Sequence, residues 1–215
     1  MARKPADQSV SRDEIIIAAA DVLQRNGYES ATMKDIAAAV NLTAASLYHH
    51  FKNKDSLLLA VLERGLDAVI ERIEPIIEAP LPPAQKLRAM TREHIVGLTE
   101  NTAIGAVMVF EIRSLIHVKA PPAKATADDL LAYQDFVDRR DNFFRRRDYF
   151  EGLFRQVLSE GVQSGAFRPI DVPIATKTLL GAHNWVGVWY RPKGRLNGDQ
   201  IANFMTDVIL KGIEC

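Results

Sequence analysis

Apolar residues recur at spacings of three and four along almost the whole chain, and two-residue alternation is nearly absent. The first spacing places apolar side chains on one face of a helix, whereas half-buried strands need alternation. Of the 215 residues, 47% are hydrophobic, which is enough to build a sizeable core. We therefore expect an all-α fold without a sheet.

Capping residues mark where these helices begin. Ser11 with Glu14 and Thr32 with Asp35 have the spacing of capping boxes, and Pro75 is expected to kink or end a long helix. Prolines and small residues over 118–125 predict the most loop-like segment. The expected helices span about 12–26, 32–40, 43–51, 54–75, 83–100, 103–116, 126–164, 171–190 and 197–212.

Composition and the absence of certain motifs exclude several classes of protein for this chain. Cys215 is the only cysteine, so a disulfide framework or CxxC pair is excluded, and a reducing compartment such as the cytoplasm is expected. We expect no signal peptide and no membrane span, because the longest nearly apolar run, 102–110, is about half a span. Neither a phosphate-binding loop nor the usual hydrolase and metalloprotease motifs occur, and the histidines lack metal-ligand spacing. We expect no enzyme activity, no cofactor and no metal.

The helices over 32–40 and 43–51 have the dimensions of a helix-turn-helix unit, with 12–26 covering its back. Asn41 lies at the turn, where a left-handed conformation is needed and asparagine tolerates it best after glycine. Leu47 with Ile36 supplies the shared core. The second helix keeps a small, mainly polar face that fits a groove, formed by Thr43, Ala44, Ala45, Ser46 and His49.

This segment resembles the TetR family of one-component transcriptional repressors. The matching residues are Thr32, Asp35, Ile36, Ala37, Leu47, Tyr48, His50, Phe51, Lys54 and Leu57. Departures include Asn41 at the family's turn glycine and Ala45 at a position that the family fills with glycine. The resemblance implies a three-helix DNA-binding domain over residues 1–54 and a six-helix ligand-binding and dimerisation domain over 55–215.

Charge alone does not reveal a DNA-binding surface. Residues 1–54 carry seven basic and six acidic side chains, so no large basic patch is expected. Phosphate contacts must therefore come from local groups. We assign them to Thr32, Thr43, the Tyr48 hydroxyl, the helix N-terminus and side chain of Lys54, and an N-terminal arm with Arg3 and Lys4.

Two arginines interrupt an apolar stripe on the helix over 126–164. Arg139 and Arg146 alternate with Phe136, Phe143 and Phe150 at spacings of three and four. A guanidinium among aromatic rings needs an anionic partner. Two alternatives remain open: an internal carboxylate such as Glu111, or an anion of the ligand.

These residues lead to a hypothesis about the effector. Aromatic side chains from three helices could line one cavity, with Arg146 binding an acid or phosphate. The expected ligand-binding residues are Phe110, Glu111, Phe143, Arg146, Phe150, Trp185 and Trp189. We expect an elongated, mainly apolar anion, with an acyl-CoA ester as the leading candidate and a free fatty acid or aromatic drug as the runner-up. The segments 146–149, 165–168 and 184–192 are similar to TetR-family regulators of fatty-acid and sterol catabolism that respond to acyl-CoA esters.

The last two helices, 171–190 and 197–212, have apolar residues on more than one face, including Phe204 and Val208. In the family this pair forms the interface of a homodimer, which two reading helices need to reach successive major grooves. The function expected is therefore a dimeric repressor that binds palindromic operator DNA and is released by its ligand. The alternatives are a helical protein-interaction adaptor without DNA binding, and an enzyme with its chemistry around His94, Glu111 and Arg146.

Overall fold

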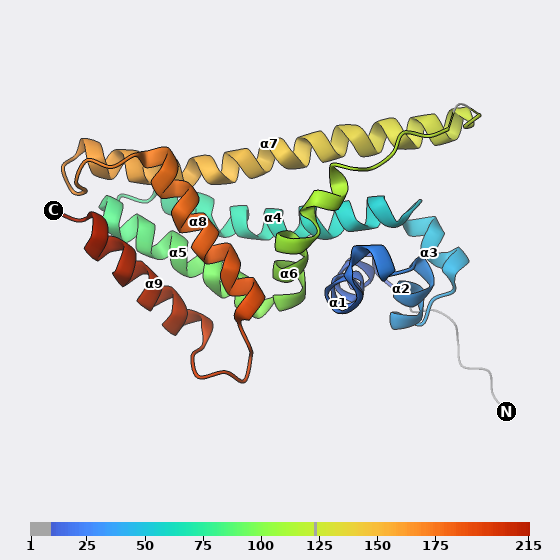
Figure 1. Cartoon of the computed structure of the whole chain (residues 1–215), viewed down its shortest axis with the longest axis horizontal. Helices are drawn as coiled ribbons and strands as arrows, with labels where there is room; N and C mark the ends of the chain where they lie inside the picture. Colours follow the sequence, from blue (N-terminus) through green and yellow to red (C-terminus); the bar gives the residue numbers. More distant parts are fainter. Residues whose placement is uncertain (1–9, 123) are drawn as a thin grey trace.

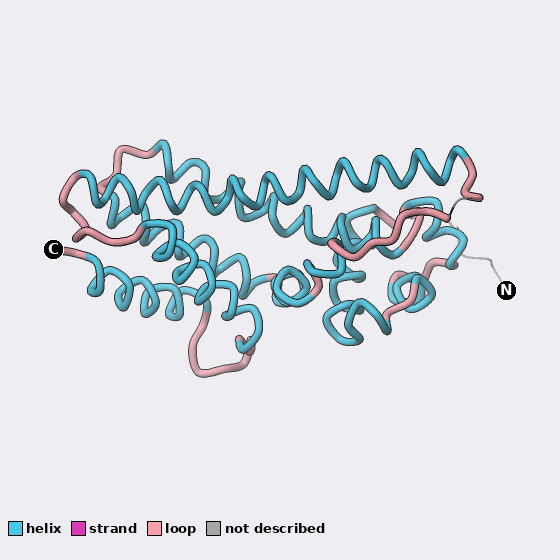
Figure 2. Tube along the Cα trace, turned by 45° about the horizontal axis from the view of Figure 1, so that its top comes forward, coloured by secondary structure: helices cyan, strands magenta, loops and turns pink. Residues whose placement is uncertain are grey.

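The computed structural model describes residues 10–122 and 124–215, and over these residues the chain is helical with no strand (Figure 2). The all-α prediction is confirmed. In chain order the elements are α1 (Arg12–Ser30), α2 (Met33–Ala39), α3 (Ala44–His50), α4 (Lys54–Glu78), α5 (Pro83–Glu100), α6 (Thr102–Phe110), the 3-10 helix η1 (Ile112–Leu115), α7 (Ala127–Gln163), α8 (Val172–Trp189) and α9 (Gly198–Ile213).

The elements form an elongated body (Figure 1). Helices α1, α2 and α3 gather at one end, and the C-terminus lies at the other end beside α9. The long helices α4 and α7 run side by side along the body, and α5, α8 and α9 pack together beyond α6. Helix α4 begins next to the short helices α2 and α3 and extends to the helices of the larger part. A shift of α4 would therefore move residues in both parts of the molecule.

The capping boxes form where the sequence predicts them. The hydroxyl of Ser11 accepts a hydrogen bond from the Glu14 N–H, and Thr32 does the same for Asp35. Asn41 has a φ of 56°, so the turn between α2 and α3 uses the left-handed conformation expected there. Gly27 has a φ of 73° and breaks α1, which continues as a last turn to Ser30.

Besides the extra turn of α1, two helix ends differ from the prediction. Pro75 lies inside α4, which continues to Glu78. Because Pro75 has no N–H, the Glu71 carbonyl loses its helical donor, and the helix ends within the next turn. Helix α6 ends at Phe110 instead of near residue 116. The chain then tightens into η1, which brings Leu115 into the core with no exposed surface.

One connected core joins the helix-turn-helix segment to the rest. Ile15 on α1, Ile36 on α2 and Leu47 on α3 are fully buried in the same cluster as Leu57 on α4 and Phe143 on α7. The domain boundary after residue 54 remains a prediction. No helix in the described part of the chain is long and apolar enough to cross a membrane.

Candidate nucleic-acid interface and ligand pocket

Helix α3 packs into the core through its apolar residue, Leu47, and the opposite face of the helix is exposed to solvent. Leu47 is fully buried, whereas Tyr48 is 51% exposed and the neighbouring His49 is exposed. Ala45 is also exposed, while Ala44 and Ser46 are half-buried. The arrangement leaves a short, mainly polar helix face of the width that a major groove accepts.

The predicted threonines act first as helix caps. The Thr43 hydroxyl accepts from the Ser46 N–H at 3.0 Å and lies 2.8 Å from the Ser46 hydroxyl. The Thr32 hydroxyl donates to Asp35 Oδ2 at 2.7 Å. Hydrogen bonds from Thr32 lower the pKa of the Asp35 carboxyl. Both threonines are exposed, so each can still meet a phosphate at the helix N-terminus that it caps.

The prediction for the Lys54 side chain needs correction. Its ammonium donates to the main-chain carbonyls of Tyr28 at 2.6 Å and Ala31 at 3.0 Å, and lies over the Tyr28 ring. These carbonyls are the free acceptors at the end of α1, beyond the break at Gly27. The charge therefore ties α1 to α4 and does not reach outward to a phosphate. Only the N-terminus of α4 remains available for that contact.

Further hydrogen bonds at this contact between α1 and α4 involve Tyr28. Its hydroxyl donates to Asp55, and burial together with this carboxylate raises the Tyr28 pKa. Its N–H donates to Glu111 Oε1 at 3.1 Å. Glu111, expected to bind ligand or pair with an arginine, therefore connects the end of α6 to the broken end of α1. The predicted N-terminal arm with Arg3 and Lys4 lies outside the described residues.

A pocket of about 360 Å³ lies among α4, α5, α6, α7 and α8, with Ile17 of α1 at its edge. Its volume is within the range of small-molecule sites. The wall is mostly apolar, with residues such as Val69, Leu98, Ile104, Met108 and Phe150. Polar lining groups comprise Arg64, Glu71, Arg72, His94, Asn101, Arg147 and Asn184.

The expected ligand-binding residues do not gather around one cavity. Phe150 lines this pocket, whereas Phe110 and Glu111 line a separate hollow of about 670 Å³ between α1, α6 and the end of α8. Phe143 is buried in the core. Trp185 and Trp189 on α8 are 56% and 46% exposed and line neither hollow. The prediction of one aromatic cavity is wrong, because the spacing within each helix does not fix which neighbour each face meets.

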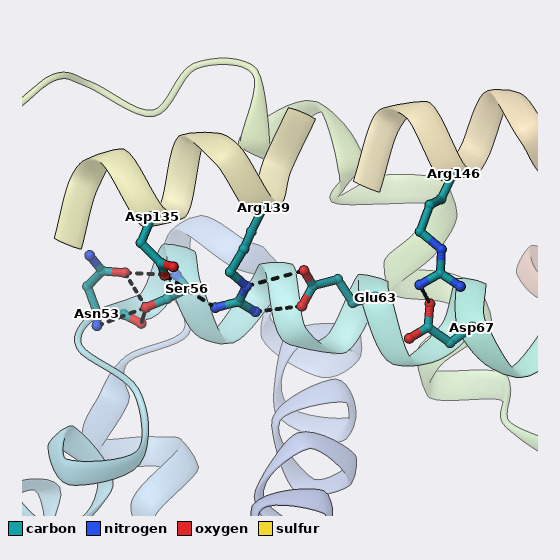
Figure 3. Close-up of polar contacts among 7 residues, drawn as sticks. All are labelled: Asn53, Ser56, Glu63, Asp67, Asp135, Arg139 and Arg146. Atoms are coloured by element: carbon teal, nitrogen blue, oxygen red, sulfur yellow. Dashed lines mark hydrogen bonds and ion pairs between the residues drawn. The ribbon is translucent and has the colours of Figure 1, made fainter. Parts of the chain in front are cut away.

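Both stripe arginines are paired with α4 (Figure 3). Arg139 pairs with Glu63, with Nη2 2.5 Å from Oε2, and Arg146 pairs with Asp67. The internal ion-pair alternative is therefore confirmed for both arginines, but the predicted partner Glu111 is wrong. Arg146 does not line the pocket.

Arg147 takes the place that the sequence prediction gave to Arg146. It lines the pocket from α7, and Arg64 lines it from α4. Neither guanidinium has an ion-pair partner within residues 10–122 and 124–215. Only the positions of neighbouring helices distinguish Arg147 from Arg146, so the sequence alone carried no signal for this choice.

His94, which the sequence analysis named only for the enzyme alternative, is a further lining residue. It is 5% exposed, and its ring makes edge contacts with Phe150, at 5.2 Å between centroids, and with His183, at 5.4 Å. Burial lowers the pKa of His94 to about 4, and burial together with His94 lowers that of His183. Both imidazoles are thus neutral at neutral pH.

Two family models match the chain. Residues 15–61 match the model of bacterial regulatory proteins of the tetR family, and residues 137–213 match the tetracyclin repressor-like C-terminal domain. The chain belongs to the TetR family. Both models are those of transcriptional regulators and not of enzymes.

Other TetR-family proteins align over nearly the whole chain. The HTH-type transcriptional repressor KstR2 of Mycolicibacterium smegmatis is 29% identical over 211 residues, which are 97% of this chain and 93% of KstR2. The crystal structure of PfmR from Thermus thermophilus has a TM-score of 0.78 and 28% identity, covering 94% of this chain and all of PfmR. AibR in complex with isovaleryl coenzyme A and operator DNA has a TM-score of 0.73 and 26% identity, covering 92% and 96% of the two chains.

Large apolar side chains are exposed on the last two helices of this TetR-family chain, α8 and α9. Phe204 and Val208 on α9 are 67% and 57% exposed, and α8 adds Ile174, Trp185 and Trp189. We call these five residues the α8–α9 face. Large apolar side chains that remain exposed on neighbouring elements can mark a protein-protein contact.

Proposed function

We propose that this chain is a dimeric transcriptional repressor that binds palindromic operator DNA through α3 and is released by a mainly apolar anion. The carrying observation is the α2–α3 unit, in which Leu47 is buried while Tyr48 and His49 face outward. Such a helix reads base edges from a major groove while its caps and neighbouring helix N-termini meet phosphates.

The α8–α9 face supports a two-fold dimer. Burying Phe204, Val208 and the two tryptophans against a second copy would remove their apolar surface from water. An isologous contact of this kind is the commonest form of homodimer. Trp185 and Trp189 then serve assembly in place of the ligand role that the sequence suggested.

The pocket of about 360 Å³ supports an effector with an apolar body and an anionic group. The apolar wall takes the body, and Arg64 with Arg147 offers two guanidinium groups to a carboxylate or phosphate. An acyl-CoA ester remains the leading candidate, with a free fatty acid as the simpler one. AibR, which was solved with isovaleryl coenzyme A, gives this class a precedent among similar structures.

Release requires that the ligand prefer a conformation that does not bind DNA. Shifting a population from 1:99 to 99:1 takes about 5.5 kcal/mol of differential affinity. Ile104 and Met108 of α6 line the pocket. At the end of α6, the Glu111 carboxylate accepts a hydrogen bond from the Tyr28 N–H. Displacing α6 would disturb this joint, and α4 offers a second route from the pocket to its own N-terminus.

The test is a gel-shift assay with the upstream DNA of the protein's own gene, with unrelated DNA of equal length as control. We expect a sequence-specific complex that is lost on adding decanoate or decanoyl-CoA. Lack of specific binding would contradict the repressor function and favour the adaptor. A specific complex that resists both compounds would contradict only the proposed effector class.

A further inference from the structure

A group of unpaired polar atoms lies in the apolar core beside the pocket. Thr91 Oγ1, His94 Nδ1 and both ring nitrogens of His183 are buried without a hydrogen-bond partner in the described part of the chain. Buried polar atoms are nearly always paired, and each one left unpaired costs stability. Such atoms call for a partner that the described residues do not supply, either a bound water or a ligand atom.

His94 is the member of this cluster that reaches the pocket. It lines the wall, whereas Thr91 and His183 are not among the lining residues. The His94 ring is more than nine-tenths buried and is fixed between Phe150 and His183. Its Nδ1 is buried away from solvent, whereas Nε2 is not among these buried unpaired atoms, so Nε2 is the ring nitrogen that a ligand can reach. Depending on the tautomer, Nε2 donates to a carbonyl or accepts from a hydroxyl group.

We propose that His94 hydrogen-bonds a neutral oxygen function, a carbonyl or a hydroxyl, on the apolar part of the effector. This inference rests on the proposed function and adds a second recognition point to it. Arg64 and Arg147 bind the anionic group, and His94 recognises the oxygen within the apolar wall. Within the proposed effector class, oxo- or hydroxy-substituted acids, or their thioesters, are therefore preferred over saturated acyl chains.

The chemistry of the wall explains why one histidine is enough for selection. Around it, Phe150, Leu98 and Ile104 contribute only apolar surface, which discriminates poorly between similar chains. A buried group built to hydrogen-bond the ligand disfavours an analogue that lacks the partner, because the protein atom is then left unpaired. Oxygenated compounds are thereby separated from their fully reduced counterparts.

The direct test compares decanoate with a series of its oxo and hydroxy derivatives, with the oxygen moved along the chain. Isothermal titration calorimetry on the full-length protein measures each dissociation constant. We expect at least one derivative to bind about tenfold more tightly than decanoate, which corresponds to about 1.4 kcal/mol, the contribution of one hydrogen bond. Equal binding of decanoate and every derivative would overturn the role of His94 while leaving the effector class of the proposed function intact.

Two matched variants test whether His94 causes the preference for oxygenated derivatives over decanoate. His94→Phe keeps a ring of similar shape but removes both nitrogens, so we expect it to bind decanoate and the derivatives equally. His183→Phe makes the same chemical change next to the pocket without altering its lining, and we expect it to keep the tenfold preference. A preference that survives in His94→Phe would overturn the proposal. If neither decanoate nor any derivative binds the wild-type protein, the proposal is wrong, and the response of the DNA complex to decanoyl-CoA in the gel-shift assay decides the effector class separately.

A measurement on the wild-type protein covers the case in which His94→Phe does not fold. Long-range ¹H–¹⁵N NMR spectra report the hydrogen bonding of each imidazole nitrogen. We expect the His94 ring signals to move on adding the tightest derivative and to stay in place with decanoate. Unchanged His94 signals at saturation with that derivative would overturn the proposal.

Discussion

Arg139 on α7 pairs with Glu63 on α4, and their closest nitrogen and oxygen atoms are 2.5 Å apart (Figure 3). Arg146 and Asp67 form a second pair farther along the same two helices. The two pairs tie α7 to α4 along the body of the molecule. Both stripe arginines, Arg139 and Arg146, are engaged in these ion pairs. Arg147 is the arginine of α7 that lines the pocket.

Arg147→Ala should weaken the binding of decanoate about tenfold, because it removes a charge that faces the pocket, and it should leave the binding of uncharged decanol unchanged. Arg146→Ala is the matched control. Its ion pair is partly exposed, at 40% and 38% for the two side chains, so its loss should cost about 0.5 kcal/mol of stability and no ligand affinity. Calorimetric titration separates the two variants. Weaker decanoate binding by Arg146→Ala alone would restore the original assignment.

Lys54→Ala should lower the free energy of unfolding by about 2 kcal/mol, because the carbonyls of Tyr28 and Ala31 lose their charged donor. Lys52→Ala removes a nearby exposed lysine and should change stability little. Urea unfolding followed by circular dichroism measures both. Equal stability of Lys54→Ala and wild type, with a smaller salt dependence of DNA binding, would favour a phosphate contact after all.

Phe204→Glu or Val208→Glu should give folded monomers, since a charge would be placed in the α8–α9 face. Leu131→Glu is the control, because Leu131 on α7 is 69% exposed but lies outside this face. Sedimentation velocity at micromolar concentration should show dimers for wild type and the control. A monomeric wild-type protein would contradict the proposed interface.

Stability should fall as the pH drops from about 6.5 towards 4. In this window the unfolded chain binds protons on His94 and His183, while burial keeps their folded-state pKa values low. The full contribution is present above pH 6.5, and His94 alone accounts for a loss on the order of 3 kcal/mol on reaching pH 4. Urea unfolding at several pH values should show a shallower slope for His94→Phe, and an unchanged slope would argue against a neutral buried imidazole.

The helices and their caps could be predicted because they depend on local spacing. Thr32 with Asp35 forms its capping box, and Asn41 adopts the left-handed conformation, since both depend on residues close in the chain. The end of α6 lies earlier than predicted, and the residue that follows it, Glu111, contacts Tyr28, which is distant in the chain.

The pocket could not be predicted to the same degree. Choosing between Arg146 and Arg147 requires the rotation of α7 relative to α4, which the spacing within α7 does not contain. The same holds for Trp185 and Trp189, whose aromatic character suits a ligand wall and a dimer interface equally well. The role of the Lys54 side chain could not be predicted, because its partners are main-chain carbonyls at the end of α1. Their position depends on how the chain turns at Gly27 and on how α1 packs against α4.

The most direct test of DNA recognition by α3 is the affinity of Tyr48→Ala for the upstream DNA of the protein's own gene, measured by fluorescence anisotropy. Tyr149→Ala is the control, because Tyr48 and Tyr149 are 51% and 49% exposed but only Tyr48 lies on α3. We expect Tyr48→Ala to bind at least about tenfold more weakly with an unchanged melting temperature, and Tyr149→Ala to bind as wild type does. Equal affinity of Tyr48→Ala and wild type for this DNA would contradict the placement of the reading helix.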